Sequence, residues 1–455
     1  MMTADKKDIL FIIYPLFILT NICYNIILNK FATRSDSLNN TTGISFRIIP
    51  ETRFKTSVIT LTLVCPLSSD TAAANSLLPH LLSRACSKYP DITALKRKLA
   101  SLYGAVLSGD VISIGDAQLL RFTVRSIDDR YTMDGEKISV ECAQLLSDIL
   151  TSPPLADGLF RSDFIESEKR LQCEKIDAQI NDKVSYSTRR CIELMCEGEP
   201  FGVNPLGDKE AVGALNAENM TELWTRVLRT YPVHLTAVGS MDGDAVKRAF
   251  TEAFSSVDRA SCKLPSHIFI EKADKAREFT DYEDVTQSKL VLGFRTPFNC
   301  TNDPYIMRLV SACFGGTAHS RLFVNVREKM SLCYYCSSSY FSSKGILLVR
   351  SGLESENIEK AKTEIMAQLA DIQNGGLTDE EIANAKMSLR NSFLESLDSP
   401  RATELWYTSQ MFDSTVLSVE EACAKIDSYT KEDVTNAARA ISLDTVYLLT
   451  KRGEQ

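Results

Sequence analysis

The sequence predicts an α+β fold of two similar halves, each with a mostly antiparallel sheet covered by helices on one face. Segments that read as strands follow one another through short turns, and helical segments occur in runs, which is typical of α+β proteins. One order of elements appears twice along the chain. The tripeptide at 101–103 resembles that at 331–333, and Gly115 and Gly345 follow at the same offset. We interpret the repetition as an internal duplication.

Periodicity assigns the elements of both halves. In the first half they are a strand at Ser57–Cys65, helices at Asn75–Lys88 and Ile92–Ser101, strands at Tyr103–Ile114 and Gln118–Arg125, a helix from about Met133 and a closing strand at Val233–Val238. In the second half they are a strand at Lys289–Arg295, helices at Asp303–Phe314 and Ser320–Met330, strands at Leu332–Phe341 and Ile346–Arg350, a helix from Glu356 and a closing strand at Thr445–Leu449.

These elements divide the chain into two domains with a linker between them. Residues 43–257 form the N-terminal domain, and residues 285–455 form the C-terminal domain. The polar stretch 258–284 is predicted to be the linker. Domains of roughly 200 residues are of ordinary size. Residues 1–42 precede the first domain as an N-terminal extension.

The N-terminal extension contains an uncharged run, residues 9–28, between lysines. A run of about twenty residues is just long enough to span a bilayer, so a membrane anchor is one interpretation. The run is also dominated by residues that AT-rich codons specify, which favours a start codon assigned too far upstream. Both interpretations stay open, and we expect the folded protein to begin near Gly43 in either case.

Composition and net charge limit the classes of protein and of function that fit this sequence. Hydrophobic residues make up 44% of the 455 residues and charged residues 24%, as in globular proteins. The net charge of −8 gives no basis for binding nucleic acid or an anionic membrane. The thirteen cysteines favour reduced thiols in the cytoplasm over a disulfide framework. Cys333 and Cys336 fall in a predicted strand, where residues three apart point to opposite faces, so we interpret them as packing residues.

The most specific pattern lies in the second half. It reads FGGTAHSRLF over residues 314–323 and VREKMSLCY over residues 326–334. This pattern resembles the C-terminal domain of the pitrilysin/insulinase/mitochondrial-processing-peptidase superfamily of zinc peptidases, and the resemblance extends over nearly the whole chain from Gly43. It implies two insulinase-like domains. It also implies that Arg327 and Tyr334 bind the substrate backbone and the tetrahedral intermediate, as hydrogen-bond donors can.

The zinc motif of this superfamily is degenerate here. Active members carry His-x-x-Glu-His on a helix, so that both histidines bind zinc and the glutamate activates a water. Here His80 keeps the first histidine, Ser83 replaces the glutamate and Arg84 replaces the second histidine. An arginine cannot ligate zinc, and a serine cannot serve as this base. The third ligand position falls on Lys175, and Glu174 is one residue out of register. The sequence therefore predicts neither zinc nor another cofactor.

A further resemblance points to one branch of the superfamily. Segments 46–56, 103–105 and 200–207 look like those of bacterial insulinase-like proteins without the zinc motif. This YfmF-like group is associated by name with aminopentanol modification of elongation factor P. Relatives with broken zinc sites commonly act as the non-catalytic half of a pair. The resemblance thus implies a heterodimer with a paralogue that keeps the zinc motif, in which this chain binds unfolded peptide but has no peptidase activity alone. The alternative is a peptide-binding or scaffold protein without a proteolytic role.

Overall fold

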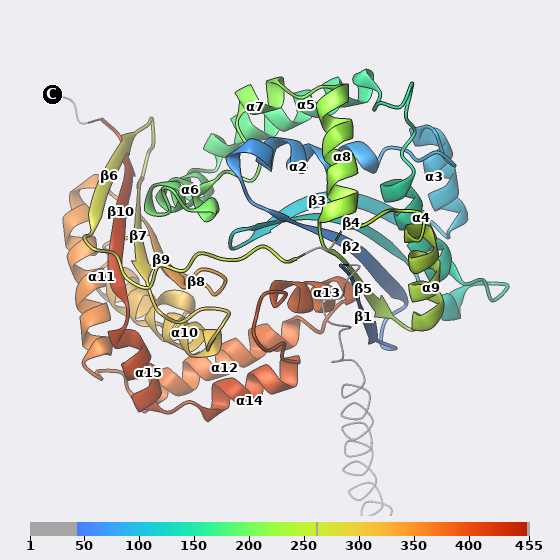
Figure 1. The fold of residues 1–455 in the computed structure, drawn as a ribbon. Helices are drawn as coiled ribbons and strands as arrows, with labels where there is room; N and C mark the ends of the chain where they lie inside the picture. The colour runs from blue at the N-terminus through green and yellow to red at the C-terminus, as the bar shows by residue number, and fades with distance from the viewer. Residues whose placement is uncertain (1–42, 261–262, 453–455) are drawn as a thin grey trace, which may run out of the picture.

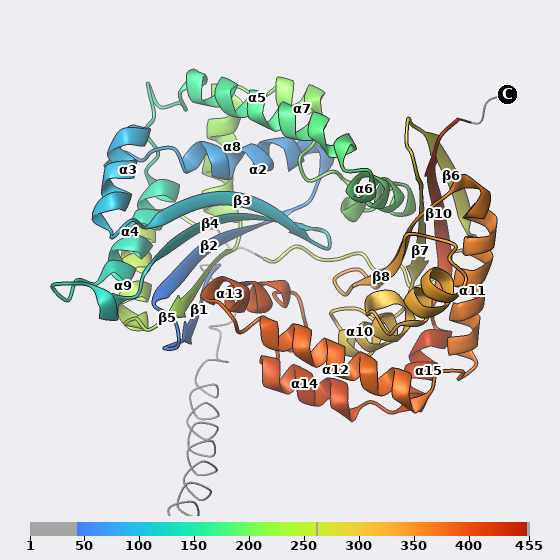
Figure 2. The ribbon, with the colours of Figure 1, turned by 180° about the vertical axis from the view of Figure 1, so that it is seen from behind.

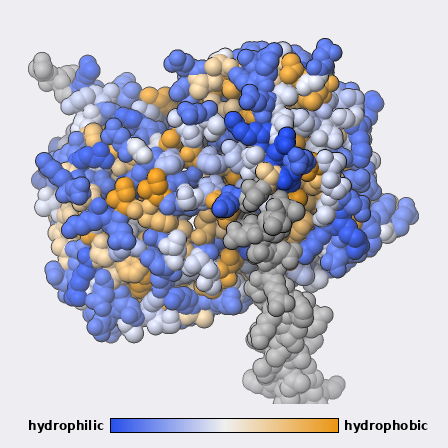
Figure 3. All heavy atoms as spheres, viewed as in Figure 1, coloured by the Kyte–Doolittle hydropathy of each residue, from blue (hydrophilic) through white to orange (hydrophobic). Residues whose placement is uncertain are grey.

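The computed structural model describes residues 43–260 and 263–452, and the structural statements below refer to these residues. The predicted N-terminal extension, including the run at 9–28, lies outside them. The described chain forms two lobes, each with one sheet and its own helices (Figures 1 and 2). Within these residues, no helix combines the length and the apolar character needed to cross a membrane. The side of the molecule seen in Figure 3 carries mainly hydrophilic residues, with hydrophobic ones in smaller groups between them.

Each lobe contains a five-stranded sheet, and the two sheets have the same topology. The strand order is β1-β5-β2-β4-β3 in the N-terminal lobe and β6-β10-β7-β9-β8 in the C-terminal lobe. In both lobes the first and last strands pair in parallel, and all other neighbours are antiparallel. This confirms that the chain has two similar halves. The strands are β1 (Ile44–Pro50), β2 (Thr56–Pro66), β3 (Val106–Ile114), β4 (Ala117–Ile127), β5 (Val233–Gly239), β6 (Arg277–Tyr282), β7 (Ser288–Arg295), β8 (Tyr335–Phe341), β9 (Ile346–Leu353) and β10 (Ser442–Thr450).

Helices follow the strands of each lobe, and short polar side chains cap many of them. Ser68 accepts the backbone N–H of Asp70 at the start of α2 (Ser69–Leu82), and Asp91 accepts that of Ala94 at the start of α3 (Ile92–Ser101).

The N-terminal helices are α2, α3, α4 (Ile138–Thr151), α5 (Ser162–Ala178), α6 (Lys183–Met195), α7 (Lys209–Gly213), α8 (Ala217–Thr230) and α9 (Gly243–Phe254), with short turns η1 (Asp129–Tyr131), η2 (Gln179–Asn181) and η3 (Pro200–Gly202). The C-terminal helices are α10 (Pro304–Ser311), α11 (Ile358–Gln373), α12 (Asp379–Glu395), α13 (Pro400–Ser409), α14 (Val419–Ser428) and α15 (Lys431–Arg439), with π-helical segments η4 (Ala312–Gly316) and η5 (Leu322–Lys329) and the turn η6 (Ser355–Asn357).

Each sheet is covered on one face by helices of its own lobe and on the other by a helix of the opposite lobe. Helices α2 and α4 pack on one face of the N-terminal sheet, and α13 from the C-terminal lobe packs against β2 and β5 on the other (Figures 1 and 2). Reciprocally, α6 from the N-terminal lobe packs against β7 and β10. The predicted α+β fold with helices covering each sheet is confirmed. Only the expectation that one face is covered needs correction, because a helix from a distant part of the chain covers the second face.

Buried ion pairs join the two lobes. Arg121 on β4 donates to Glu404 on α13 at 2.7 Å, and both side chains are almost fully buried. Arg295 on β7 pairs with Glu199 of the N-terminal lobe at 2.6 Å and with Asp444 at 2.8 Å. Buried charges are tolerated only when they are paired and hydrogen-bonded. The pairs Arg121–Glu404 and Arg295–Glu199 therefore connect the lobes through charges that are buried together with their partners.

Several boundaries differ from the sequence prediction. The predicted linker 258–284 contains the edge strand β6, whose alternate residues are exposed. Its charged residues hide the strand pattern, because an edge strand tolerates polar side chains. The helix predicted to extend to Lys88 ends at Leu82, and the strand predicted from Leu332 begins at Tyr335.

Candidate functional site

The degenerate zinc motif lies at the end of α2, which packs against β3 and β4. His80 occupies the last turn of the helix, Ser83 is its C-cap, and Arg84 follows the helix. Pro79, also in this last turn, has no backbone N–H to donate. The Ser83 hydroxyl is buried and has no hydrogen-bond partner among the described residues. An active motif needs both histidines on one continuous helix face, so the early end of α2 is an obstacle in addition to the substitutions.

Helix α5 brings Lys175 directly against His80. The Nζ of Lys175 lies 3.2 Å from Nε2 of His80, and because an ammonium can only donate, the imidazole nitrogen is the acceptor. Burial lowers the pKa of His80, and the positive charge of Lys175 lowers it further. The imidazole is therefore neutral at pH 7, and the lone pair that would bind a metal is engaged by a cation.

Arg84, which occupies the second histidine position, also contacts α5. Arg84 Nη1 donates to Glu168 Oε1 at 2.7 Å, and its guanidinium lies over the ring of Phe164. Glu174, the glutamate one residue away from the third ligand position, forms an ion pair with Arg170 at 3.1 Å on the exposed side of α5. Within the described residues, no group of three or more His, Cys, Asp or Glu side chains is placed to hold a metal ion. The zinc ion that active members of the superfamily bind does not fit this set of side chains.

Arg327 lies on the π-helical segment η5 of the C-terminal lobe. Its guanidinium lies 4.5 Å from the ring centroid of Phe323, and its Nη1 lies 3.5 Å from Glu328. The side chain is 38% exposed. An exposed ion pair of this kind contributes little stability, so Arg327 can exchange this partner for another at small cost.

Tyr334 lies seven residues after Arg327, immediately before β8. Its hydroxyl donates to Glu354 at 2.7 Å, and this hydrogen bond raises the pKa of Tyr334. The residue is 54% exposed. In the described residues, no hydrogen bond or ion pair connects Arg327 or Tyr334 with His80 or Lys175, which lie in the other lobe.

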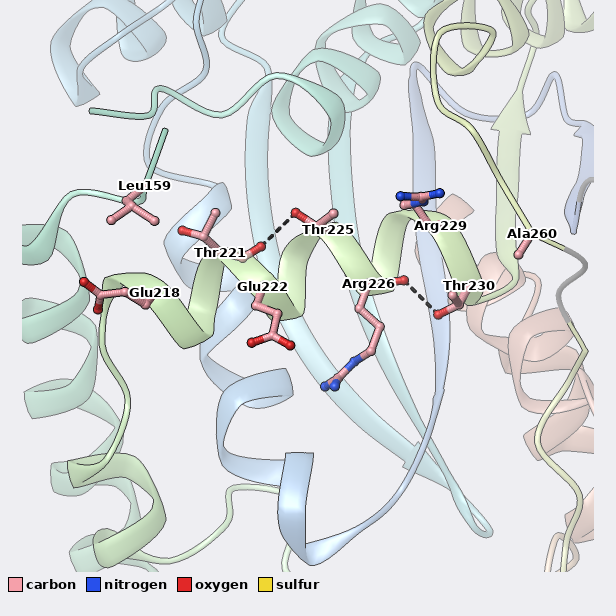
Figure 4. Close-up of a pocket in the computed structure, with 9 residues that line it drawn as sticks. All are labelled: Leu159, Glu218, Thr221, Glu222, Thr225, Arg226, Arg229, Thr230 and Ala260. Atoms are coloured by element: carbon pink, nitrogen blue, oxygen red, sulfur yellow. Dashed lines mark hydrogen bonds between the residues drawn. The ribbon is translucent and has the colours of Figure 1, made fainter. Parts of the chain in front are cut away.

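A surface hollow lies along the outer side of α8 (Figure 4). The hydroxyls of Thr225 and Thr230 in this hollow donate to carbonyls of their own helix. Its lining residues are Leu159, Glu218, Thr221, Glu222, Thr225, Arg226, Arg229, Thr230 and Ala260. The lining includes none of the site residues predicted from the sequence.

Two lobes of identical topology, with a zinc motif that keeps only its first histidine, define a peptidase-like protein with a degenerate metal site. A family model described as "Peptidase M16 inactive domain" matches residues 214–389. The "Probable inactive metalloprotease YmfF" of Bacillus subtilis (strain 168) is 32% identical over 408 residues, which cover 90% of this chain and 96% of that protein. The chain therefore belongs to the M16 peptidase family, in a branch of inactive homologues.

Two further similarities concern the family and the fold. The "Uncharacterized zinc protease YmxG", also of Bacillus subtilis (strain 168), is 24% identical over 284 residues, covering 59% of this chain and 65% of that protein. The crystal structure of a conserved protein from Enterococcus faecalis V583 matches with a TM-score of 0.84 at 24% identity, covering 93% of this chain and 100% of that chain. This structural likeness supports the fold. The resemblance to inactive M16 peptidases, inferred from the motifs, is thus confirmed.

Proposed function

We propose that this chain is the non-catalytic subunit of a heterodimeric insulinase-like zinc peptidase, and that it contributes Arg327 and Tyr334 to peptide binding at the partner's active site. One contrast carries the proposal. In the N-terminal lobe, Lys175 and Glu168 engage the residues at the zinc-ligand positions. In the C-terminal lobe, the guanidinium and the phenol remain exposed on the surface.

The chemistry of the exposed pair suits a shared active site. A guanidinium and a phenol can both donate to a developing oxyanion, and that stabilisation is useful beside a zinc-bound water that attacks a peptide carbonyl. A paralogue that keeps His-x-x-Glu-His would supply the zinc and the general base. Bacillus subtilis has one relative named as a probable inactive metalloprotease and another named as a zinc protease, which are the two kinds of chain that the proposal requires.

The sheet order supports an extended peptide as the ligand. β8 is an outer strand of the C-terminal sheet and follows directly after Tyr334. An extended peptide can pair with such an edge through main-chain hydrogen bonds. An unfolded segment would thereby pass next to the phenol of Tyr334.

Peptidase assays of the purified chain, alone and mixed with the zinc-motif paralogue from the same organism, test the proposal. The panel contains unstructured fluorogenic peptides, including segments of elongation factor P, because the branch is associated by name with its modification. We expect no cleavage by the chain alone and chelator-sensitive cleavage by the mixture. Arg327→Ala should lower the rate by about 10²-fold to 10³-fold, as expected for loss of an oxyanion donor.

Lys329→Ala is the matched control, because it removes an exposed cation from the same segment. Lys329 donates to Asn325 and has no proposed role in binding, so this variant should keep the activity of the mixture. Equal activity of wild type and Arg327→Ala in the mixture would contradict a shared site. Peptide binding without cleavage in either sample would favour the alternative, a peptide-binding or scaffold protein without a proteolytic role.

A further inference from the structure

Cys333 and Cys336 lie on either side of the start of β8. The strand begins at Tyr335, so Cys333 belongs to the segment between η5 and the strand. The backbone of this segment adopts φ +51° at Ser331. Because Cys333 does not follow strand geometry, its side chain reaches that of Cys336, and the two thiols share a hydrogen bond. The interpretation that the two cysteines point to opposite faces is therefore wrong.

The two sulfurs have unequal surroundings. Cys336 is 3% exposed, and it lies opposite Ser351 in the β8–β9 ladder. Cys333 is only partly buried. The Ser351 side chain is within hydrogen-bonding reach of both sulfurs, and the positive charge of Arg327 acts on Cys333. Cys333 is thus the more exposed of the two residues, and Cys336 is almost fully buried.

These contacts favour a thiolate at Cys333. The hydrogen bond from Cys336, together with the Ser351 side chain and the Arg327 charge, lowers the pKa of Cys333 to about 7, against the effect of partial burial. The same hydrogen bond raises the pKa of Cys336. By contrast, burial raises the pKa of Cys142 and Cys313 to about 12. A low pKa combined with access from solvent is the property of reactive cysteines.

We propose that Cys333 and Cys336 form a reversible dithiol/disulfide pair that reacts with low-molecular-weight disulfides. The Cys333 thiolate attacks one sulfur of the small disulfide, whose S–S bond breaks and releases one thiolate. Cys336 gives its proton to that thiolate and attacks the Cys333 sulfur, which expels the second thiolate. The two protein thiols lose two electrons in total, and the small disulfide is reduced to two thiols that take up the two protons.

This chemistry acts on the segment that carries Tyr334, because the disulfide would close a ring that contains this residue. The significance of that position rests on the proposed peptide-binding role. The proposed reaction of the two cysteines does not depend on that role, because its test measures the products formed at Cys333 and Cys336 and needs neither a partner protein nor a peptide substrate.

Glutathione disulfide is the probe, and peptide mass spectrometry of the folded full chain is the readout. In wild type we expect a Cys333–Cys336 disulfide and no lasting glutathione adduct at either position. Cys336→Ala should instead retain glutathione on Cys333, because the resolving thiol is gone. Cys333→Ser should abolish both products, because Cys336 is buried. Cys336→Ser serves as a second variant if the alanine variant folds poorly.

Cys173→Ser is the control, since Cys173 is a partly buried cysteine on α5. It should form the Cys333–Cys336 disulfide as wild type does. Two results would overturn the proposal. One is a Cys333 that stays unmodified while Cys173 of the same sample takes up glutathione. The other is a glutathione adduct that persists on Cys333 of the wild-type protein.

Discussion

The Nζ of Lys344 lies 2.9 Å from Oδ1 of Asp116, and this ion pair joins two equivalent hairpins from the two lobes. Asp116 lies in the β3–β4 turn beside Gly115, and Lys344 lies in the β8–β9 turn beside Gly345. Both glycines adopt positive φ, +53° and +65°, as tight turns require. The duplicated hairpins therefore meet at the lobe interface, where one copy supplies the anion and the other the cation.

Replacing Lys344 by methionine should destabilise the protein strongly. Its Nζ also lies 2.9 Å from Glu199, and the three side chains are nearly inaccessible. The variant would leave Asp116 buried without its cation and Glu199 with Arg295 alone. Breaking a buried pair in this way costs about 3–5 kcal/mol. Urea denaturation of wild type and Lys344→Met measures the difference in the free energy of unfolding.

Lys88→Met is the matched control for this substitution. Lys88 pairs with Asp148 at 2.8 Å, but its side chain is 55% exposed. Loss of an exposed ion pair costs less than about 1 kcal/mol. If Lys344→Met lowers the free energy of unfolding no more than Lys88→Met does, the ion pair of Lys344 with Asp116 is not important for stability.

The fold could be predicted largely from local periodicity. The helix predicted at Ile92–Ser101 is observed with those bounds as α3, and the strand predicted at Lys289–Arg295 starts one residue earlier as β7. The sequence prediction missed β1 and β6, the first strand of each lobe. Both lie at a sheet edge and pair in parallel with the last strand of their lobe. Such pairing joins residues far apart in sequence, so a local pattern cannot reveal it.

Replacing Lys175 by methionine should raise the pKa of His80, because it removes a positive charge next to the imidazole. An NMR titration of the histidine ring protons measures this pKa, with His80→Gln to assign the resonance. Arg170→Met removes an exposed cation from the same helix and should leave the titration unchanged. An unchanged or lower pKa of His80 in Lys175→Met would show that the contact between the two side chains does not form in solution.

The triple substitution Ser83→Glu, Arg84→His and Lys175→Glu should create a zinc site. It restores the two histidines and one glutamate of the ligand set and removes two cations. Zinc content after dialysis, and the rise in Tm on adding zinc, should distinguish the variant from the wild-type chain. A triple variant without zinc would contradict this prediction and would show that the end of α2 at Leu82, more than the residue types, prevents the site from forming.

The sequence predicted which ligands are missing from the zinc site but not what replaces them. Ser83 and Arg84 are incompatible with zinc by residue type alone. The pairs Arg84–Glu168 and His80–Lys175 depend on how closely α2 and α5 approach each other, which no local pattern encodes. The contact between Cys333 and Cys336 was missed because the predicted strand began three residues too early.

His234 makes the stability of the protein depend on pH. It lies buried on β5, with Nδ1 2.7 Å from the hydroxyl of Ser45. Burial, assisted by the charge of Arg47, lowers the pKa of His234 to about 3, whereas an unfolded histidine titrates near 6.5. The unfolded state therefore binds more protons between these values, so the contribution of His234 to stability is complete above about pH 6.5 and is lost as the pH falls toward 3.

Between about pH 6.5 and 4.5, wild type should lose about 2 kcal/mol more of its free energy of unfolding than His234→Gln. Glutamine can still hydrogen-bond to Ser45 but does not titrate. The comparison is needed because burial raises the pKa of Asp413 to about 6, which favours the folded state as the pH falls and acts in the opposite direction. Urea denaturation of both proteins at each pH measures the difference. Parallel pH profiles of the two proteins would show that His234 is not held neutral in the folded state.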